Sequence, residues 1–380
     1  MNSIVPKGLF PTASRAVSIA TRNIYTKKYL GLEFIKNKEK QAQAKAGKNV
    51  IKIKERFMKI YNKEGIKVLK KNEILFFMHF VDGEKDMVNL SKVLEDYLAH
   101  AGTNPKDKER IFSACIRTCH LRNDLKYSRL LSEGAFFQAF DKNPQAIQTH
   151  FQLLYNHGHY QELVDIFERI SKVKNAAHMA IVMAALCRIG TPEAYKKATE
   201  IAQDKLSMPE DGRPKELFAW FSIQMGHYDI AIETLKKTKT PSSNVTEILK
   251  SVKATSKISL NVVLLALVRS GKVDICLSEM TNVLKNYSKF DFISVYSYEL
   301  LGEIAKAVKH DEKLTQMYKE LPNDLEEKGK MDNATVEELV FRPISVSPHS
   351  ISSDKSFYNP NSYVDPNRVR KLESKDLFDE

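Results

Sequence analysis

The pattern of apolar positions along the chain predicts helices that come in pairs. Residues 260–268 contain one polar side chain, Asn261, among eight apolar ones, and a second amphipathic run begins after Gly271. The first run is too short to cross a bilayer and too long for a typical buried strand. A glycine between two such runs favours a tight turn, because glycine adopts a positive φ angle at low cost. This stretch therefore predicts a helical hairpin.

The same layout recurs along the chain and predicts a series of hairpins. Apolar residues lie two, five and nine positions after Gly158, Gly226 and Gly271, which places each trio on one side of a helix. Seven predicted turns, 32 to 45 residues apart, lie at Gly83, Asn123, Gly158, Gly190, Gly226, Gly271 and Asp311. A recurring interval of this length with helical content is typical of an α-solenoid, whose units bury apolar surface by stacking. The predicted fold class is all-α.

The N-terminal 25 residues are predicted to be a mitochondrial transit peptide. They are rich in Ser and Thr and contain Lys and Arg but no acidic residue, and the first acid in the chain is Glu33. Residues 13–28 can form an amphipathic helix, and no continuous apolar core typical of a secretory signal is present. We expect cleavage near Tyr25 and location in the mitochondrial matrix. The alternative is a disordered basic N-terminus.

The rest of the chain divides into three predicted regions. Residues 26–72 contain 15 Lys or Arg against four Glu, so most of the net charge of +12 lies in this predicted basic helical arm. Residues 73–320 contain the predicted hairpins. Residues 321–380 lack helical periodicity and are rich in Ser, Pro and Asn, which predicts a largely disordered tail. No segment is apolar enough over 18 residues to predict a membrane span.

Two stretches resemble the pentatricopeptide repeat family. They are "SACIRTCHLRNDLKYSRLL" at 113–131 and "SLNVVLLALVRSGKVDICLSEM" at 259–280. The resemblance implies hairpins that bind single-stranded RNA and a role in mitochondrial mRNA maturation, and through it in respiratory-chain function. The peptide-binding tetratricopeptide family is the nearest alternative. It favours a small residue seven positions before the turn, and three of the four residues there are large: Phe151, Met183, Ala219 and Leu264.

The resemblance also implies which side chains contact the bases. In that family two residues per repeat read one base, and the corresponding pairs are Asn261 with Asp291, Ser113 with Asn143, and Gln148 with His178. The family code associates the first pair with uracil and the second with adenine, whereas the third departs from the code. The alternative role for Asn261 is an ordinary helix cap before an apolar run.

The basic arm supplies a second set of candidate RNA contacts. Exposed lysines there can meet phosphates without reading sequence, and the candidates are Lys36, Lys38, Lys40, Lys52 and Lys54. The alternative is a solvated charged helix with no ligand.

Enzymatic chemistry has little support in the sequence. It contains no H-E-x-x-H, C-x-x-C or phosphate-loop motif, so we expect no catalytic residues, metal, cofactor or small-molecule substrate. Cys115 and Cys119 lie four residues apart and are expected to be small buried side chains. The expected partners are single-stranded mitochondrial RNA and a mitochondrial RNA-processing enzyme. The alternative is a helical adaptor that binds protein at the mitochondrial ribosome or an assembly factor.

Overall fold

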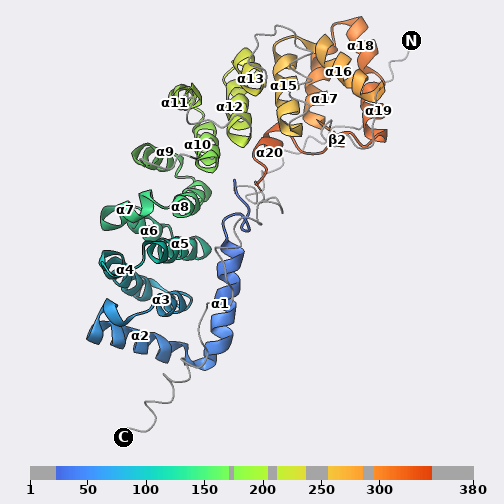
Figure 1. The fold of residues 1–380 in the computed structure, drawn as a ribbon. Coiled ribbons are helices and arrows are strands. Elements are labelled where there is room, and N and C mark those ends of the chain that lie inside the picture. Colours follow the sequence, from blue (N-terminus) through green and yellow to red (C-terminus); the bar gives the residue numbers. More distant parts are fainter. Residues whose placement is uncertain (1–22, 171–174, 204–211, 237–255, 286–294, 345–380) are drawn as a thin grey trace.

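The computed structural model describes residues 23–170, 175–203, 212–236, 256–285 and 295–344, and these residues are mostly helical (Figure 1). Two helices precede the hairpins, α1 (Leu32–Ala46) and α2 (Val50–Glu64). Short 3-10 turns at Gly47–Asn49 and Ile66–Val68 follow them. The only strands in the described part are β1 (Tyr296–Ser297) and β2 (Met331–Asp332), which pair in parallel. The predicted all-α class is thus confirmed at the level of its helices.

Each of the seven predicted turns separates two helices. The pairs are α3 (Lys71–Met78) with α4 (Glu84–Ala99), α5 (Pro105–Leu121) with α6 (Leu125–Leu131), α8 (Pro144–Asn156) with α9 (Tyr160–Arg169), α10 (Ala176–Ile189) with α11 (Pro192–Gln203), α12 (Arg213–Gln224) with α13 (Tyr228–Leu235), α15 (Lys257–Arg269) with α16 (Val273–Lys285), and α17 (Tyr298–Val308) with α18 (Glu312–Tyr318). A 3-10 turn at Gly134–Phe136 and helix α7 (Phe137–Asp141) lie between the second and third pairs.

The turn chemistry explains why the chain reverses at these points. All five predicted turn glycines have φ between 68° and 82°, and Asn123 has φ 55°. Glycine accepts this left-handed conformation because it has no Cβ, and Asn accepts it because its short polar side chain bonds locally. Asp311 works differently, because its φ is −118° and its carboxylate caps α18 by accepting from the Leu314 amide at 2.9 Å.

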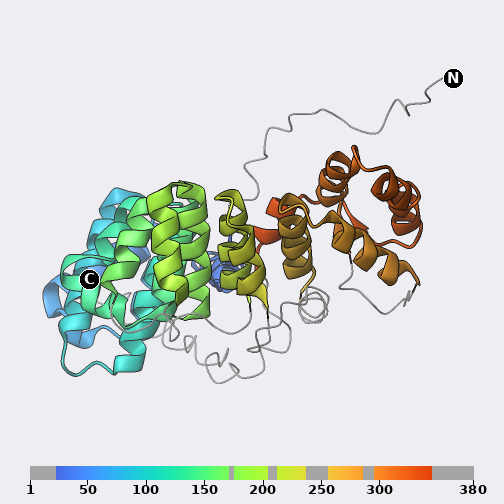
Figure 2. The ribbon, with the colours of Figure 1, turned by 90° about the horizontal axis from the view of Figure 1, so that it is seen from above.

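Successive pairs pack through their first helices. Helices α3, α5, α8, α10, α12, α15 and α17 contact one another in that order, and they form an inner row (Figure 1). The second helices of the pairs lie mainly on the outer side of this row. Seen from above, the pairs follow one another along the long dimension of the molecule (Figure 2). One continuous apolar core joins the pairs, from Phe57 and Ile74 to Val340, as expected for units that cannot bury their apolar faces alone.

Two predicted domain boundaries do not coincide with the limits of the described fold. Residues 321–344 fold, forming α19 (Leu321–Glu327), β2 and α20 (Val336–Val340), and Leu325, Val336 and Leu339 are fully buried. At the other end, Ile24 and Tyr25 are 3% and 1% exposed, so cleavage after Tyr25 would strip two side chains from the core. Residues 1–22 and 345–380, with the rest of the predicted transit peptide and tail, lie outside the described residues.

Candidate nucleic-acid interface

Helix α2 carries a basic stripe on the side opposite its buried face. Phe57 and Tyr61 pack inward and are 7% and 5% exposed. The opposite side carries Lys52, Arg56, Lys59 and Lys63, at intervals of four, three and four residues that keep them on one face of a helix. We call these four residues the α2 stripe. It spans about 16 Å at a rise of about 1.5 Å per residue.

Three of the four residues of the α2 stripe are lysines that make no ion pair among the described residues. Lys52, Lys59 and Lys63 are exposed, and no carboxylate lies within ion-pair distance of them among the described residues. Arg56 is half-buried. Glu55 is exposed three residues after Lys52 and four before Lys59, but the three lysines outnumber it and leave a net positive surface that suits a polyanion.

The predicted arm lysines do not all join this surface. Lys36 and Lys40 are exposed on α1 and Lys52 belongs to the α2 stripe. Lys38 is half-buried and its ammonium lies 5.6 Å from the Phe34 ring centroid. Lys54 is a poor candidate, because its ammonium lies 2.5 Å from Asp86 in a half-buried ion pair.

Lys54 lies in a polar cleft where α1 and α2 meet the first hairpins. The cleft is also lined by Glu39, His79 and Arg122, and a second ion pair there joins Arg122 to Glu39 at 3.2 Å. Desolvation, with Arg122 and Lys38 nearby, lowers the pKa of His79 to about 4, so this imidazole is neutral at pH 7. These ion pairs hold the basic arm against the hairpins. The charges of Lys54 and Arg122 are thus paired with carboxylates of the protein itself.

Sequence reasoning missed Arg56, Lys59 and Lys63. Their spacing with Lys52 is visible in the sequence once Phe57 and Tyr61 are recognised as the buried side of the helix. A second apolar alignment, Val50, Ile53, Phe57 and Ile60, is equally visible in the sequence and points to a different buried side. Of these only Phe57 is buried; the other three are half-buried.

The structure corrects the role expected for Asn261. Its side chain is fully buried, and its amide Nδ2 donates to the carbonyls of Lys257 at 2.7 Å and Val295 at 2.8 Å. Its Oδ1 accepts from the Ser297 amide at 2.8 Å. Asn261 therefore ties α15 to the chain before α17, and its polar atoms are not available to a base. It is not the helix cap either, since Ser256 caps α15.

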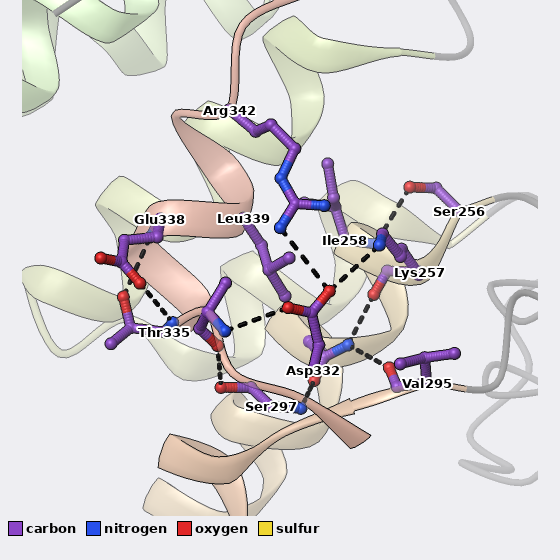
Figure 3. A network of polar contacts seen from close by, with 12 residues as sticks. Ser256, Lys257, Ile258, Val295, Ser297, Asp332, Thr335, Glu338, Leu339 and Arg342 are labelled. Carbon is purple, nitrogen blue, oxygen red and sulfur yellow. Dashed lines mark hydrogen bonds and ion pairs between the residues drawn. The ribbon is translucent and has the colours of Figure 1, made fainter. Parts of the chain in front are cut away.

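A polar network surrounds this junction (Figure 3). Asp332 of β2 lies between the ammonium of Lys257, at 3.1 Å, and the guanidinium of Arg342, at 3.6 Å. Ser297 donates its hydroxyl to the Ala334 carbonyl at 2.7 Å. The network fixes residues 331–342 against α15, which explains why this segment folds despite its weak helical pattern.

Ser113 and Asn143 lie together, as their pairing in sequence implied, but they face each other inside the protein. The Ser113 hydroxyl donates to Asn143 Oδ1 at 2.9 Å, and the two residues are 5% and 4% exposed. Asn143 also donates to the Glu109 carbonyl and caps α8 through the Ala146 amide. In this conformation the pair caps α8 and its polar atoms bond within the protein, so nothing here supports the prediction that it reads adenine.

The remaining predicted readers have mixed placement. His178 is fully buried and its Nε2 lies 2.9 Å from the Pro144 carbonyl, so it does not face a ligand. Gln148 is half-buried, and its Nε2 has no hydrogen-bond partner. Asp291 lies outside the described residues.

The inner row is covered by the chain's own segments. Helix α1 packs on α5, and α20 packs on α12 and α15 (Figure 1). Residues 23–30 contact α5 and α8 through Arg117 and Gln152. The inner side of the first helices is thus occupied over α5 to α15 by the protein itself.

The cysteines are buried, as predicted. Cys115 and Cys119 are buried, and burial raises the pKa of the Cys115 thiol to about 12. Within the described ranges, no three His, Cys, Asp or Glu side chains gather as metal ligands, and no helix is both long and apolar enough to cross a membrane.

No family model matches the chain, and no curated protein matches it.

Proposed function

We propose that this protein is a mitochondrial single-stranded RNA-binding protein, built as a pentatricopeptide-like α-solenoid, that assists mRNA maturation without catalysing it. The observation that carries the proposal is the α2 stripe, with three exposed lysines at helical spacing and no acidic partners among the described residues. RNA phosphates attract such a surface through release of their counterions. The repeating helix pairs and the resemblance at 113–131 and 259–280 support the family part of the proposal.

The α2 stripe matches the geometry of an extended strand. Its neighbouring cations are separated along the axis by about 4.5–6 Å, given the rise of the helix. Contacts of this kind position a strand and supply affinity, but they carry no sequence information. Because the candidate base readers Asn261, Ser113 and Asn143 are buried, the proposed binding is weakly sequence-specific. Presentation of a transcript to a processing enzyme needs no more than this.

Titration of fluorescently labelled, unstructured RNA with the full chain tests the proposal. At about 50 mM salt we expect binding, and log K should fall with log salt at a slope of about −2, the value for three phosphate contacts on a single strand. The slope is decisive because it reports the number of phosphate contacts. Absence of binding at about 50 mM salt contradicts the proposal.

The second candidate function is a protein-binding adaptor in mitochondria. The observation that favours it is the covered inner row, where polypeptide rather than nucleic acid already contacts the first helices. Failure of the RNA titration, together with recovery of a stable protein complex from mitochondria, would favour the adaptor.

A further inference from the structure

The two ends of the described chain meet on the inner row. Tyr25 and Ile344 form a parallel bridge in which the Ile344 amide donates to the Ile24 carbonyl at 2.8 Å. The Thr26 amide returns a bond to the Ile344 carbonyl at 3.1 Å. These residues are about 320 positions apart in sequence, yet they form one short piece of paired backbone. We call residues 23–30 and 337–344, joined in this way, the clasp.

Four successive first helices each send one polar side chain to the clasp. From α5, Arg117 Nε donates to the Leu30 carbonyl at 2.9 Å. From α8, Gln152 Oε1 accepts from the amides of Ile24 and Tyr25 at 3.0 and 2.9 Å.

The other two anchors are arginines that hold the C-terminal half. From α10, the Arg188 guanidinium lies 4.0 Å from the Phe341 ring centroid and 2.7 Å from the Glu337 carboxylate. From α12, Arg213 Nη1 donates to the carbonyls of Leu339 and Val340 at 3.1 and 2.5 Å. The anchors therefore recur once per hairpin, in the order of the hairpins along the row.

Most of these bonds go to backbone atoms. Carbonyl and amide groups are common to any extended polypeptide, so these bonds recognise the backbone of the clasp and not particular side chains. Its apolar side chains add burial, since Ile24, Leu339 and Val340 are at most 3% exposed. In the N-terminal half, Tyr25 is buried and donates its hydroxyl to the Ala177 carbonyl. Weakening this single anchor should loosen the N-terminal half.

The groups that the clasp occupies are well suited to an anionic strand. A guanidinium bonds phosphate more strongly than a neutral carbonyl, because the acceptor then carries charge. Three of the four anchors are arginines. An intramolecular segment competes at an effective concentration of about millimolar, so it excludes a weak ligand as long as it stays docked.

We propose that the clasp is an autoinhibitory contact: the chain's own ends occupy Arg117, Gln152, Arg188 and Arg213, and their release adds these side chains to the RNA-binding surface. This inference rests on the proposed function and adds its regulation. While the clasp is docked, RNA contacts only the α2 stripe. Once it opens, the strand can extend along the inner row.

Full-length Tyr25→Ala tests the clasp, with Tyr25→Phe as the conservative control. The Ala variant should bind labelled RNA more tightly than the wild type, and its salt slope should steepen by about 2, for three added phosphate contacts. Tyr25→Phe keeps the ring and loses only the hydrogen bond to the Ala177 carbonyl. Its RNA affinity should therefore lie between those of the wild type and the Ala variant. Photo-crosslinks from 4-thiouridine RNA should appear at peptides containing Arg117 and Arg213 in the Ala variant.

Hydrogen exchange of the wild-type chain gives an independent reading if Tyr25→Ala fails to fold. RNA should speed exchange at the Ile24 and Tyr25 amides, which Gln152 protects in the docked state. Unchanged exchange, with equal affinity and slope in the Phe variant, would show that the clasp is a fixed part of the fold. In that case RNA binding through the α2 stripe stands. If no variant binds RNA, the proposed function and the autoinhibition both fail.

Discussion

At the scale of single residues, polar groups inside the hairpin stack serve the fold. The Asn261 side chain makes three hydrogen bonds to backbone groups where the chain leaves regular helix. Asn143 caps α8 and also donates to a carbonyl of α5. In sequence an amide before an apolar run has the same appearance whether it reads a base or bridges two backbones. Burial distinguishes the two roles, and burial depends on the neighbouring hairpin, which no local pattern specifies.

Asn261→Ala should destabilise the protein by about 2–4 kcal/mol, because it removes the side-chain partner of the Ser297 amide and of the Val295 carbonyl. Denaturant unfolding followed by circular dichroism measures this, with Asn62→Ala on the exposed side of α2 as the neutral control. Lower RNA affinity of Asn261→Ala at unchanged stability would instead restore Asn261 as a base reader.

A second residue-scale prediction concerns His150, which is fully buried. Desolvation, with Arg129 nearby, lowers its pKa from 6.5 to about 3, and its Nδ1 lies 2.6 Å from the Ser128 hydroxyl. Between pH 3 and 6.5 the His150 imidazole is therefore mostly protonated in the unfolded chain and neutral in the folded chain. This contribution to stability is present above pH 6.5 and is lost as the pH falls toward 3, at about 1.4 kcal/mol per pH unit.

His150→Asn keeps a hydrogen-bonding group near Ser128 and removes the titration. The free energy of unfolding, measured between pH 4 and 6, should depend on pH less steeply in this variant by about one proton. An unchanged slope would mean that His150 is already protonated in the folded protein.

At the scale of elements, the sequence predicts helices well and packing partners poorly. The seven turns are predictable because each needs a residue that accepts a special backbone conformation or caps a helix, and such residues are visible one at a time. The folding of 321–344 was missed because its helices are short and it depends on bonds to distant residues such as Arg213 and Lys257. The burial of Ile24 and Tyr25 was missed for the same reason.

The α2 stripe could be predicted from the sequence only in part. The lysine-rich composition of residues 26–72 was enough to predict a basic surface, but not which lysines compose it. Lys54 and Lys59 differ little in local sequence. Helix phase decides between them, since Lys54 faces Asp86 on α4 and Lys59 faces solvent.

At the scale of the whole molecule, the basic surface and the inner row lie in different places. The basic surface lies at one end of the row, on α2, and the inner row that would extend it is closed by the clasp (Figure 1). The proposal is that RNA binds first at this end and extends along the row only after the protein's own ends leave. The central claim is that binding begins at the α2 stripe and not through net charge alone.

Matched charge removal tests this claim most directly. The triple variant Lys52→Ala, Lys59→Ala and Lys63→Ala removes the exposed lysines of the α2 stripe. Its control, Lys309→Ala, Lys313→Ala and Lys319→Ala, removes three exposed lysines from the other end of the described chain. Salt titrations of labelled RNA should give a slope shallower by about 2 for the stripe variant and an unchanged slope for the control. Equal loss in both variants, or no loss in either, would contradict the account.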